Sequence, residues 1–279
     1  MLLRASSTLG FLTAASLFAF GCAGHNAASL STDGEALVTD NQETTETEED
    51  TETGLEEPLS GATLGAEVDT GAATTPDTVA ENGRKNPGVF FQPAGCIVST
   101  RAGAVVTHVF TNCSGPYGMV SFNGTVTSTW SKIDSGVQVV HSTKGFKINK
   151  ATVDHDVTIK YTKVGGVYTK TRSGKSSGTT GKGRAIEHSA DYVTVYDAVA
   201  KCIKRDGSSS TTIGGAAFSR SIKGYERCGI GRLGCPKSGT FTLTRPKVNL
   251  VIQFLGGTKF EIVFNGTTYD RNLICNPSA

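Results

Sequence analysis

Residues 152–162, TVDHDVTIKYT, alternate between two kinds of side chain. Apolar or aromatic residues stand at Val153, Val157, Ile159 and Tyr161, and mostly polar residues stand between them. Successive side chains of a β-strand point to opposite faces, so this period of two predicts a strand with one buried and one wet face.

The same alternation recurs through the rest of the chain after residue 86. One run places Val120, Phe122, Val126 and Trp130 on the same side of a strand. Two later runs do the same, one with Phe241 and Leu243 and the other with Phe260, Ile262 and Phe264. Turn signals separate these runs at Gly115-Pro116, Gly165-Gly166, Gly214-Gly215, Gly256-Gly257 and Asn265-Gly266. Short turns imply hairpins, and no long apolar stripe of period 3.6 follows. We therefore expect an all-β fold with almost no helix, an antiparallel meander that forms a sandwich or an open barrel.

Cysteine pairing is the second structural signal. Six of the seven cysteines lie in the C-terminal part of the chain: Cys96, Cys113, Cys202, Cys228, Cys235 and Cys275. An even number in an exported domain predicts three disulfides, and none of the spacings matches a zinc site. We expect pairing in chain order, 96 with 113, 202 with 228 and 235 with 275. The alternative joins Cys228 to Cys235 and leaves Cys202 for Cys275.

Residues 1–21 have the features of an export signal peptide. Arg4 precedes a mostly apolar core over 9–20, which is shorter than the about 20 residues that span a bilayer. Small residues followed directly by Cys22 resemble the lipobox of bacterial lipoproteins, in which this cysteine carries lipid at the mature N-terminus. Two departures are Phe20, bulkier than usual, and Ala19 in place of the commoner leucine. The resemblance implies a membrane anchor at Cys22, and plain secretion is the alternative.

The segment 22–86 is acidic and of low complexity. It is rich in Thr, Glu and Gly and has no periodic apolar stripe. Such a composition cannot bury enough surface to offset its ordering entropy, so it predicts a disordered tether between a lipidated Cys22 and the domain 87–279. The alternatives are a solvated tail with no role of its own and a segment that folds back and screens the domain.

The net charge of +2 conceals a strong asymmetry. Residues 25–86 contain fifteen Asp or Glu against two Lys or Arg, and residues 87–279 contain twenty-four Lys or Arg against ten Asp or Glu. A basic domain in a bacterial envelope meets acidic polysaccharide, lipopolysaccharide, teichoic acid, peptidoglycan carboxylates and shed DNA. Charge of this kind bears on solubility and partners, and it does not determine the fold.

Candidate chemical sites are few. In Asp154-His155-Asp156, strand alternation places the histidine with the apolar residues and the aspartates on the other face. Glu187-His188 with Asp191 is typical of a solvated turn. The stretch 173–184, SGKSSGTTGKGR, lacks the first glycine and the Ser or Thr of a phosphate-binding loop. Nucleophile elbows and His-Glu-x-x-His are also missing, so the sequence predicts no catalytic motif, metal site or cofactor.

Ten basic residues fall between 144 and 184, and tyrosines are interleaved with them. Basic groups attract polyanions, and tyrosine rings stack on sugars or bases. We therefore predict a polymer-binding set made of Lys163, Tyr168, Lys170, Arg172, Lys175, Lys182 and Arg184. The alternative is that these lysines only protect edge strands from aggregation.

The whole layout, a lipobox-like cysteine, an acidic tether and a cysteine-bounded Gly/Thr-rich β domain, resembles uncharacterised envelope lipoproteins of myxobacteria and related bacteria. That resemblance brings no activity and no site residues. We predict a noncatalytic protein, exported and anchored to the envelope at the outer membrane or cell surface. Its basic domain would bind anionic polysaccharide or another polyanion without specific nucleic-acid recognition, or serve a structural and adhesive role. The alternative is a polysaccharide lyase with Tyr161, Tyr168 and His188 as proton-transfer candidates.

Overall fold

The computed structural model describes residues 32–60, 68, 70, 71, 74–115, 118, 120–229, 235–273 and 275. The signal segment 1–21 and Cys22 lie outside the described residues, so what the sequence predicts for them stays a prediction.

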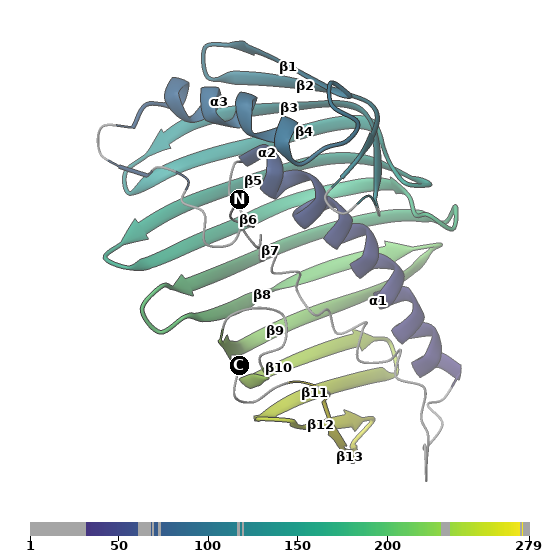
Figure 1. Cartoon of the computed structure of the whole chain (residues 1–279). Coiled ribbons are helices and arrows are strands. Elements are labelled where there is room, and N and C mark those ends of the chain that lie inside the picture. The colour runs from purple at the N-terminus through teal and green to yellow at the C-terminus, as the bar shows by residue number, and fades with distance from the viewer. Residues whose placement is uncertain are drawn as a thin grey trace.

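Thirteen strands form one antiparallel sheet in which every strand pairs with its neighbours in the chain (Figure 1). The strands are β1 Ile97–Ala102, β2 Val105–Ser114, β3 Ser121–Ile133, β4 Gly136–Ile148, β5 Ala151–Val164, β6 Val167–Thr179, β7 Ala185–Asp197, β8 Cys202–Ile213, β9 Ala216–Cys228, β10 Pro236–Arg245, β11 Val248–Gly256, β12 Lys259–Phe264 and β13 Thr267–Asn272. The predicted antiparallel meander is confirmed. The described strands form one open sheet with β1 and β13 at its two edges, so the predicted sandwich of two sheets, or open barrel, is not what they form.

Several turns lie where the glycine signals predicted them. Gly214 and Gly215 connect β8 to β9, and both have positive φ angles of 55° and 84°. Asn265 and Gly266 connect β12 to β13 with φ angles of 45° and 86°. Two consecutive positive φ angles characterise the turn whose twist matches that of paired strands, which explains why Gly and Asn occupy these positions.

Helices are the feature that the sequence did not predict. A continuous helical segment over residues 32–60 consists of α1 Thr32–Thr51, a π-helical turn Glu52–Glu56 and α2 Glu57–Ser60. We call this segment the acidic helix. A second helix, α3 Pro76–Lys85, is followed by a 3₁₀ turn Asn86–Val89. The expectation of an all-β chain with almost no helix is therefore wrong, and the fold is mostly β with helices packed against the sheet.

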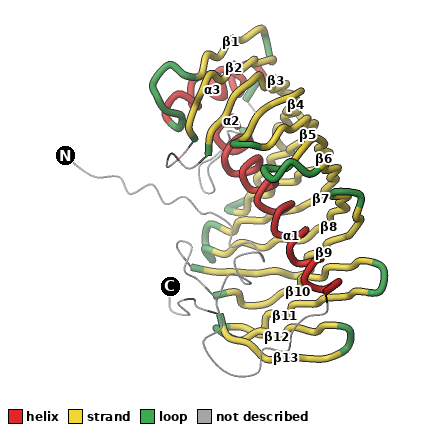
Figure 2. Tube along the Cα trace, turned by 90° about the vertical axis from the view of Figure 1, so that its right-hand side faces the viewer, coloured by secondary structure: helices red, strands yellow, loops and turns green. Residues whose placement is uncertain are grey.

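All described helices lie on the same face of the sheet, where they complete three apolar clusters. Leu37 of α1 packs over the β7–β12 end of the sheet, and Leu55 and Leu59 pack against the phenylalanines of β2, β3 and β4. Val79 and Ala80 of α3 pack with Trp130 and its neighbours. Figures 1 and 2 show the acidic helix crossing the strands diagonally. None of the described helices is both long and apolar enough to cross a membrane.

Three disulfides are present, and they join the cysteines in the predicted order: Cys96–Cys113, Cys202–Cys228 and Cys235–Cys275. The meander explains this pairing, because neighbouring segments of the chain are also neighbours in the sheet. Cys202 and Cys228, for example, are direct cross-strand partners on β8 and β9. The alternative bridge between Cys228 and Cys235 is not formed.

Candidate functional site

A line of basic side chains crosses the helix-covered face of the sheet from β5 to β10. Strand alternation places these side chains on the same face as the apolar core, and we call them the basic row. Its members are His155, Lys170, Arg172, Arg184, His188, Arg205, Arg220 and Arg245. Lys170, Arg184 and Arg245 are half-buried, and the other members of the row are more than nine-tenths buried.

The acidic helix supplies the partners of the basic row. Arg172 donates to both carboxylate oxygens of Glu56, at 2.9 and 2.8 Å. Arg205 donates to Glu52 at 3.1 Å, and the Nζ atom of Lys170 lies 2.9 Å from another oxygen of the same carboxylate. The segment that carries most of the negative charge is thus bound along the segment that carries the positive charge.

The same pattern continues toward the start of the acidic helix. Arg220 donates to Glu48, and Arg245 donates to Asp40. Arg184, directly before β7, donates to the other oxygen of Asp40 at 2.7 Å. Together these pairs span the acidic helix from residue 40 to residue 57.

Burial and charge act in opposite directions on the carboxylates of the acidic helix. Burial alone would raise the pKa of Glu52, but the positive charges of Arg205 and Lys170 outweigh it and hold the pKa at about 2. Burial is likewise overcome at Glu56, where Arg172 holds the pKa well below its usual range. These carboxylates are therefore ionised in the folded protein.

Two other glutamates of the acidic helix lack this compensation. Burial raises the pKa of Glu57 to about 7 even though Lys170 opposes the effect. Burial also raises the pKa of Glu49 to about 7, reinforced by the neighbouring negative charges of Asp50 and Glu48. These two groups make the contact between helix and sheet sensitive to pH near neutrality.

The predicted disorder of this acidic segment is wrong for residues 32–60, and the reason is long-range. Like charges four residues apart, such as Glu48, Glu52 and Glu56, destabilise an isolated helix. The basic row outweighs this repulsion. Its members lie between residues 155 and 245, far from the acidic helix in the chain. The alternative that the segment folds back and screens the domain describes the structure.

The seven residues of the predicted polymer-binding set do not form one surface. Lys170, Arg172 and Arg184 bind the acidic helix, and the Nζ atom of Lys182 lies 3.5 Å from Glu43. Lys175 is exposed on the opposite face of the sheet. The remaining two contact each other at the β5–β6 hairpin, where the Nζ atom of Lys163 lies 4.6 Å from the ring centre of Tyr168.

The predicted faces of the Asp154-His155-Asp156 cluster are confirmed. His155 is buried on the helix side, and the two aspartates lie on the other face. Its ring nitrogens lie 2.9 Å from the hydroxyl of Ser176 and 2.8 Å from Glu56. This trio resembles a hydrolase triad in composition only, because Glu56 is neutralised by Arg172 and the amides of β6 are used in ladders on both sides.

The residues named for a lyase lie apart. Tyr161 is the cross-strand partner of Lys170. His188 is the cross-strand partner of Ser176, which in turn is the partner of His155. His155 and Tyr161 are six residues apart on β5, a separation of about 20 Å at the usual rise of a strand. Burial also raises the pKa of Tyr161 to about 12, which makes it a poor base. No single sugar residue can contact Tyr161 and His188 together.

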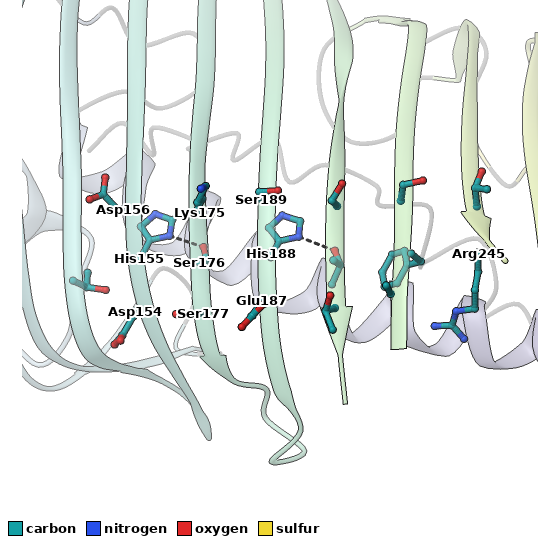
Figure 3. A pocket seen from close by; sticks show the side chains of 18 of the residues that line it. Asp154, His155, Asp156, Lys175, Ser176, Ser177, Glu187, His188, Ser189 and Arg245 are labelled. Carbon is teal, nitrogen blue, oxygen red and sulfur yellow. Dashed lines mark hydrogen bonds between the residues drawn. The ribbon is translucent and has the colours of Figure 1, made fainter. Parts of the chain in front are cut away.

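The opposite face of the sheet, which we call the open face, carries a second line of side chains. Seven consecutive cross-strand partners run from β4 to β10, and we call them the polar row: Ser142, Asp156, Lys175, Ser189, Ser210, Ser219 and Thr244. All seven line one hollow of about 880 Å³. No helix within the described residues contributes to its lining, and Figure 3 shows the hollow with the helix behind the strands.

A second row lies two residues further along each strand and lines the same hollow. It consists of Asp154, Ser177, Glu187, Thr212 and Ala217, again in direct cross-strand register. Three carboxylates and one ammonium group, that of Lys175, therefore face this hollow from the two rows. The side chains of the two rows are mainly hydroxyls and carboxylates.

Neither the acidic helix nor the polar row was predicted from the sequence, and each left a different kind of signal. Acidic residues at 40, 48, 52 and 56 repeat at multiples of four, which is a helical period in polar residues. Runs such as Ser208–Thr212 show that a strand exposes hydroxyls. Only the strand register shows that these hydroxyls line up across the sheet.

Comparisons with protein-family models, with curated proteins and with solved structures each give no match to this chain.

Proposed function

We propose that this protein is a noncatalytic, lipid-anchored protein of the bacterial cell envelope that binds an envelope or matrix polymer on the open face of its sheet. The polar row is the observation that carries this proposal. Each serine or threonine hydroxyl both donates and accepts hydrogen bonds. A file of such groups across the strands from β4 to β10 suits a long ligand that carries many hydrogen-bonding groups.

The noncatalytic assignment is supported by the placement of the histidines. His108, His141, His155 and His188 are all buried on the helix side of the sheet. Burial lowers the pKa of His108 to about 4 and that of His141 to about 3, so both are neutral at physiological pH. His155 and His188 are also among the residues that line the hollow, but their ring nitrogens already lie within hydrogen-bond distance of Ser176, Glu56 and Thr211.

Export and anchorage belong to the same proposal. Three disulfides are typical of proteins that mature in an oxidising compartment. A lipid on Cys22 would be separated from the start of α1 by residues 22–31, which span at most about 35 Å when fully extended. Because the acidic helix is bound to the sheet, the anchor would hold the sheet close to the membrane instead of on a long tether.

The test uses the full exported chain and two matched pairs of substitutions on the open face. Ser189→Ala with Ser210→Ala removes two hydroxyls of the polar row, whereas Ser208→Ala with Ser221→Ala removes two neighbouring hydroxyls outside the hollow. Binding is measured to isolated peptidoglycan, neutral and acidic envelope polysaccharide and DNA. We expect the first pair to weaken binding about tenfold and the second to leave it unchanged. Equal effects of the two pairs would exclude the open face as the binding surface.

A second candidate function is binding of an anionic polymer by the basic row after the acidic helix is displaced. The favouring observation is that the row already binds a linear polyanion, the chain's own segment 40–57. Few apolar side chains of the acidic helix are buried, mainly Leu37, Leu55 and Leu59, so its contact with the sheet is largely ionic. An acidic polymer would compete for the same cations.

Two charge-matched triple variants test this second candidate. Glu48→Gln, Glu52→Gln and Glu56→Gln remove the buried partners of the basic row, and Asp33→Asn, Glu35→Gln and Glu46→Gln remove three exposed charges of the same helix. We expect only the first variant to bind acidic polysaccharide more tightly and with a steeper salt dependence. An unchanged affinity would show that the basic row serves the acidic helix alone.

A further inference from the structure

We infer that the ligand of the open face is an extended, uncharged β-1,4-linked glycan that lies across the strands, along the polar row, with about one sugar residue per strand. This inference rests on the proposed function and specifies its ligand. It follows from the spacing, the width and the chemistry of the two rows in the hollow.

The spacing of the polar row matches a linear polymer of sugars. Neighbouring strands are about 4.8 Å apart, so the six intervals from Ser142 on β4 to Thr244 on β10 cover about 29 Å. This interval is close to the length of one pyranose residue in an extended β-1,4 chain. A chain that runs across the strands therefore meets an equivalent side chain at each successive sugar.

The width of the hollow fits the same ligand. Its second row, with Asp154, Ser177 and Glu187, is displaced by two residues along each strand, which is about 7 Å. A β-1,4 glycan is a flat ribbon whose hydroxyls project from both edges. Two parallel files of polar groups contact the two edges of such a ribbon.

The chemistry of the rows selects a polyol over a polyanion. Carboxylates accept charge-assisted hydrogen bonds from hydroxyl groups, and Asp154, Asp156 and Glu187 supply three of them. Lys175 is the cross-strand partner of Asp156, so an opposite charge stands directly beside it. The excess of carboxylates in the two rows repels an anionic chain. No aromatic residue belongs to either row, so the two rows contribute hydrogen bonds and not ring stacking.

A chain-length series tests the geometry. The full exported chain is titrated by calorimetry with β-1,4 oligomers of N-acetylglucosamine and of glucose, from the disaccharide to about the octasaccharide. We expect affinity to rise with each added sugar and to level off when the oligomer is as long as the polar row. An affinity already at its maximum for the disaccharide would overturn the extended mode, and so would the absence of binding across both series.

Substitutions and salt test the chemistry. Removing the hydroxyls of Ser189 and Ser210 together should weaken binding of the longest oligomer about tenfold. Removing those of Ser208 and Ser221 should leave its affinity unchanged. Binding should also be nearly independent of salt, because no counterions are released from a neutral glycan. A steep salt dependence, or equal losses for the two pairs, would overturn the inference.

Failure of this inference is distinguishable from failure of the proposed function. Binding of an acidic polymer that is weakened by the Ser189 and Ser210 substitutions, without binding of neutral oligomers, overturns the glycan inference and supports the open face as a binding surface. Insensitivity of every polymer to those substitutions overturns both.

Discussion

Arg172 donates two hydrogen bonds to Glu56, from a position 116 residues further along the chain, and both side chains are buried. The pair joins the most acidic part of the sequence to the most basic part. A buried charge of this kind is tolerated only with its partner in place, because desolvation of either ion alone is costly. The acidic helix and the sheet therefore fold as one unit.

Removal of one partner of this pair should destabilise the protein strongly. Arg172→Met leaves the Glu56 carboxylate buried without its guanidinium, and we expect the free energy of unfolding to fall by about 3–5 kcal/mol. Chemical denaturation of the purified exported protein measures the change. Glu35→Gln, at an exposed position of the same helix, should alter it by less than about 0.5 kcal/mol. A loss for Arg172→Met no larger than that of the control would contradict the role of the pair.

The stability should fall below about pH 4.5, and between pH 4.5 and pH 7 groups with raised and with lowered pKa values should act on it in opposite directions. Glu52, with its folded pKa held at about 2, contributes stability that is present above its unfolded pKa and lost as the pH falls below about 4.5. Glu49 and Glu57, with pKa values raised to about 7, and Asp50, with its pKa raised to about 6, bind protons more tightly when folded, so their contribution to stability falls as the pH rises above about 4.5. His108 and His141, with pKa values lowered to about 4 and 3, bind protons less tightly when folded, so their contribution rises with pH up to about 6.5. Thermal unfolding between pH 3 and pH 8 measures both limbs.

Substitution of the raised groups separates the two limbs of this profile. Relative to the unsubstituted protein, Glu49→Gln with Glu57→Gln should make the slope of stability against pH more positive between pH 5 and pH 7 and leave the acid limb in place. An unchanged slope between pH 5 and pH 7 would show that these glutamates do not contribute to it.

Each disulfide should contribute to the stability of the domain. The three bridges close loops with sequence separations of 17, 26 and 40, for which chain entropy predicts a contribution of about 3 to 4 kcal/mol each. Replacement of Cys235 and Cys275 by alanine should lower the unfolding free energy by about 4 kcal/mol. Peptide mapping of the native protein should recover the three pairs and no free thiol. A peptide linking Cys228 to Cys235 would contradict the pairing.

Lipidation of Cys22 should be detectable directly. The intact mass of the membrane-bound protein should correspond to a chain that starts at Cys22 and bears acyl groups. Cys22→Ser should move the protein to the soluble fraction, since a thioether-linked lipid can no longer form. Recovery of an unmodified Cys22 N-terminus would show plain secretion instead.

Strand assignment depended on local patterns and was therefore predictable. The alternation in 152–162 places Val153 and Val157 in the core and Asp154 and Asp156 on the open face, as expected. The order of disulfides also followed, because a meander brings neighbouring segments together. Helix 32–60 was missed because its buried face consists mostly of charged and polar residues, with few apolar ones such as Leu37, Leu55 and Leu59, and an apolar-period rule does not detect it.

The predicted polymer-binding set shows a second limit of prediction from sequence, which is that neighbours in the chain need not share a surface. Charge density along the sequence grouped Lys163, Lys175 and Arg172 together, but strand alternation separates Lys175 from Arg172 by the thickness of the sheet. Which cations remain available to a ligand depends on where the acidic helix lies. That position is determined by pairs such as Arg172–Glu56, whose members are far apart in sequence.

The sequence by itself determined the strands, the turns, the cysteine pairs and the opposite charges of the two parts, because each depends on neighbouring residues or on composition. Tertiary structure alone decided that the acidic segment is a helix on the sheet and that the polar row is continuous. Both depend on register and on long-range electrostatics. A shift of one residue in β7 would move Ser189 to the other face, and the same shift in β8 would move Ser210. No local pattern specifies the alignment of these residues across so many strands.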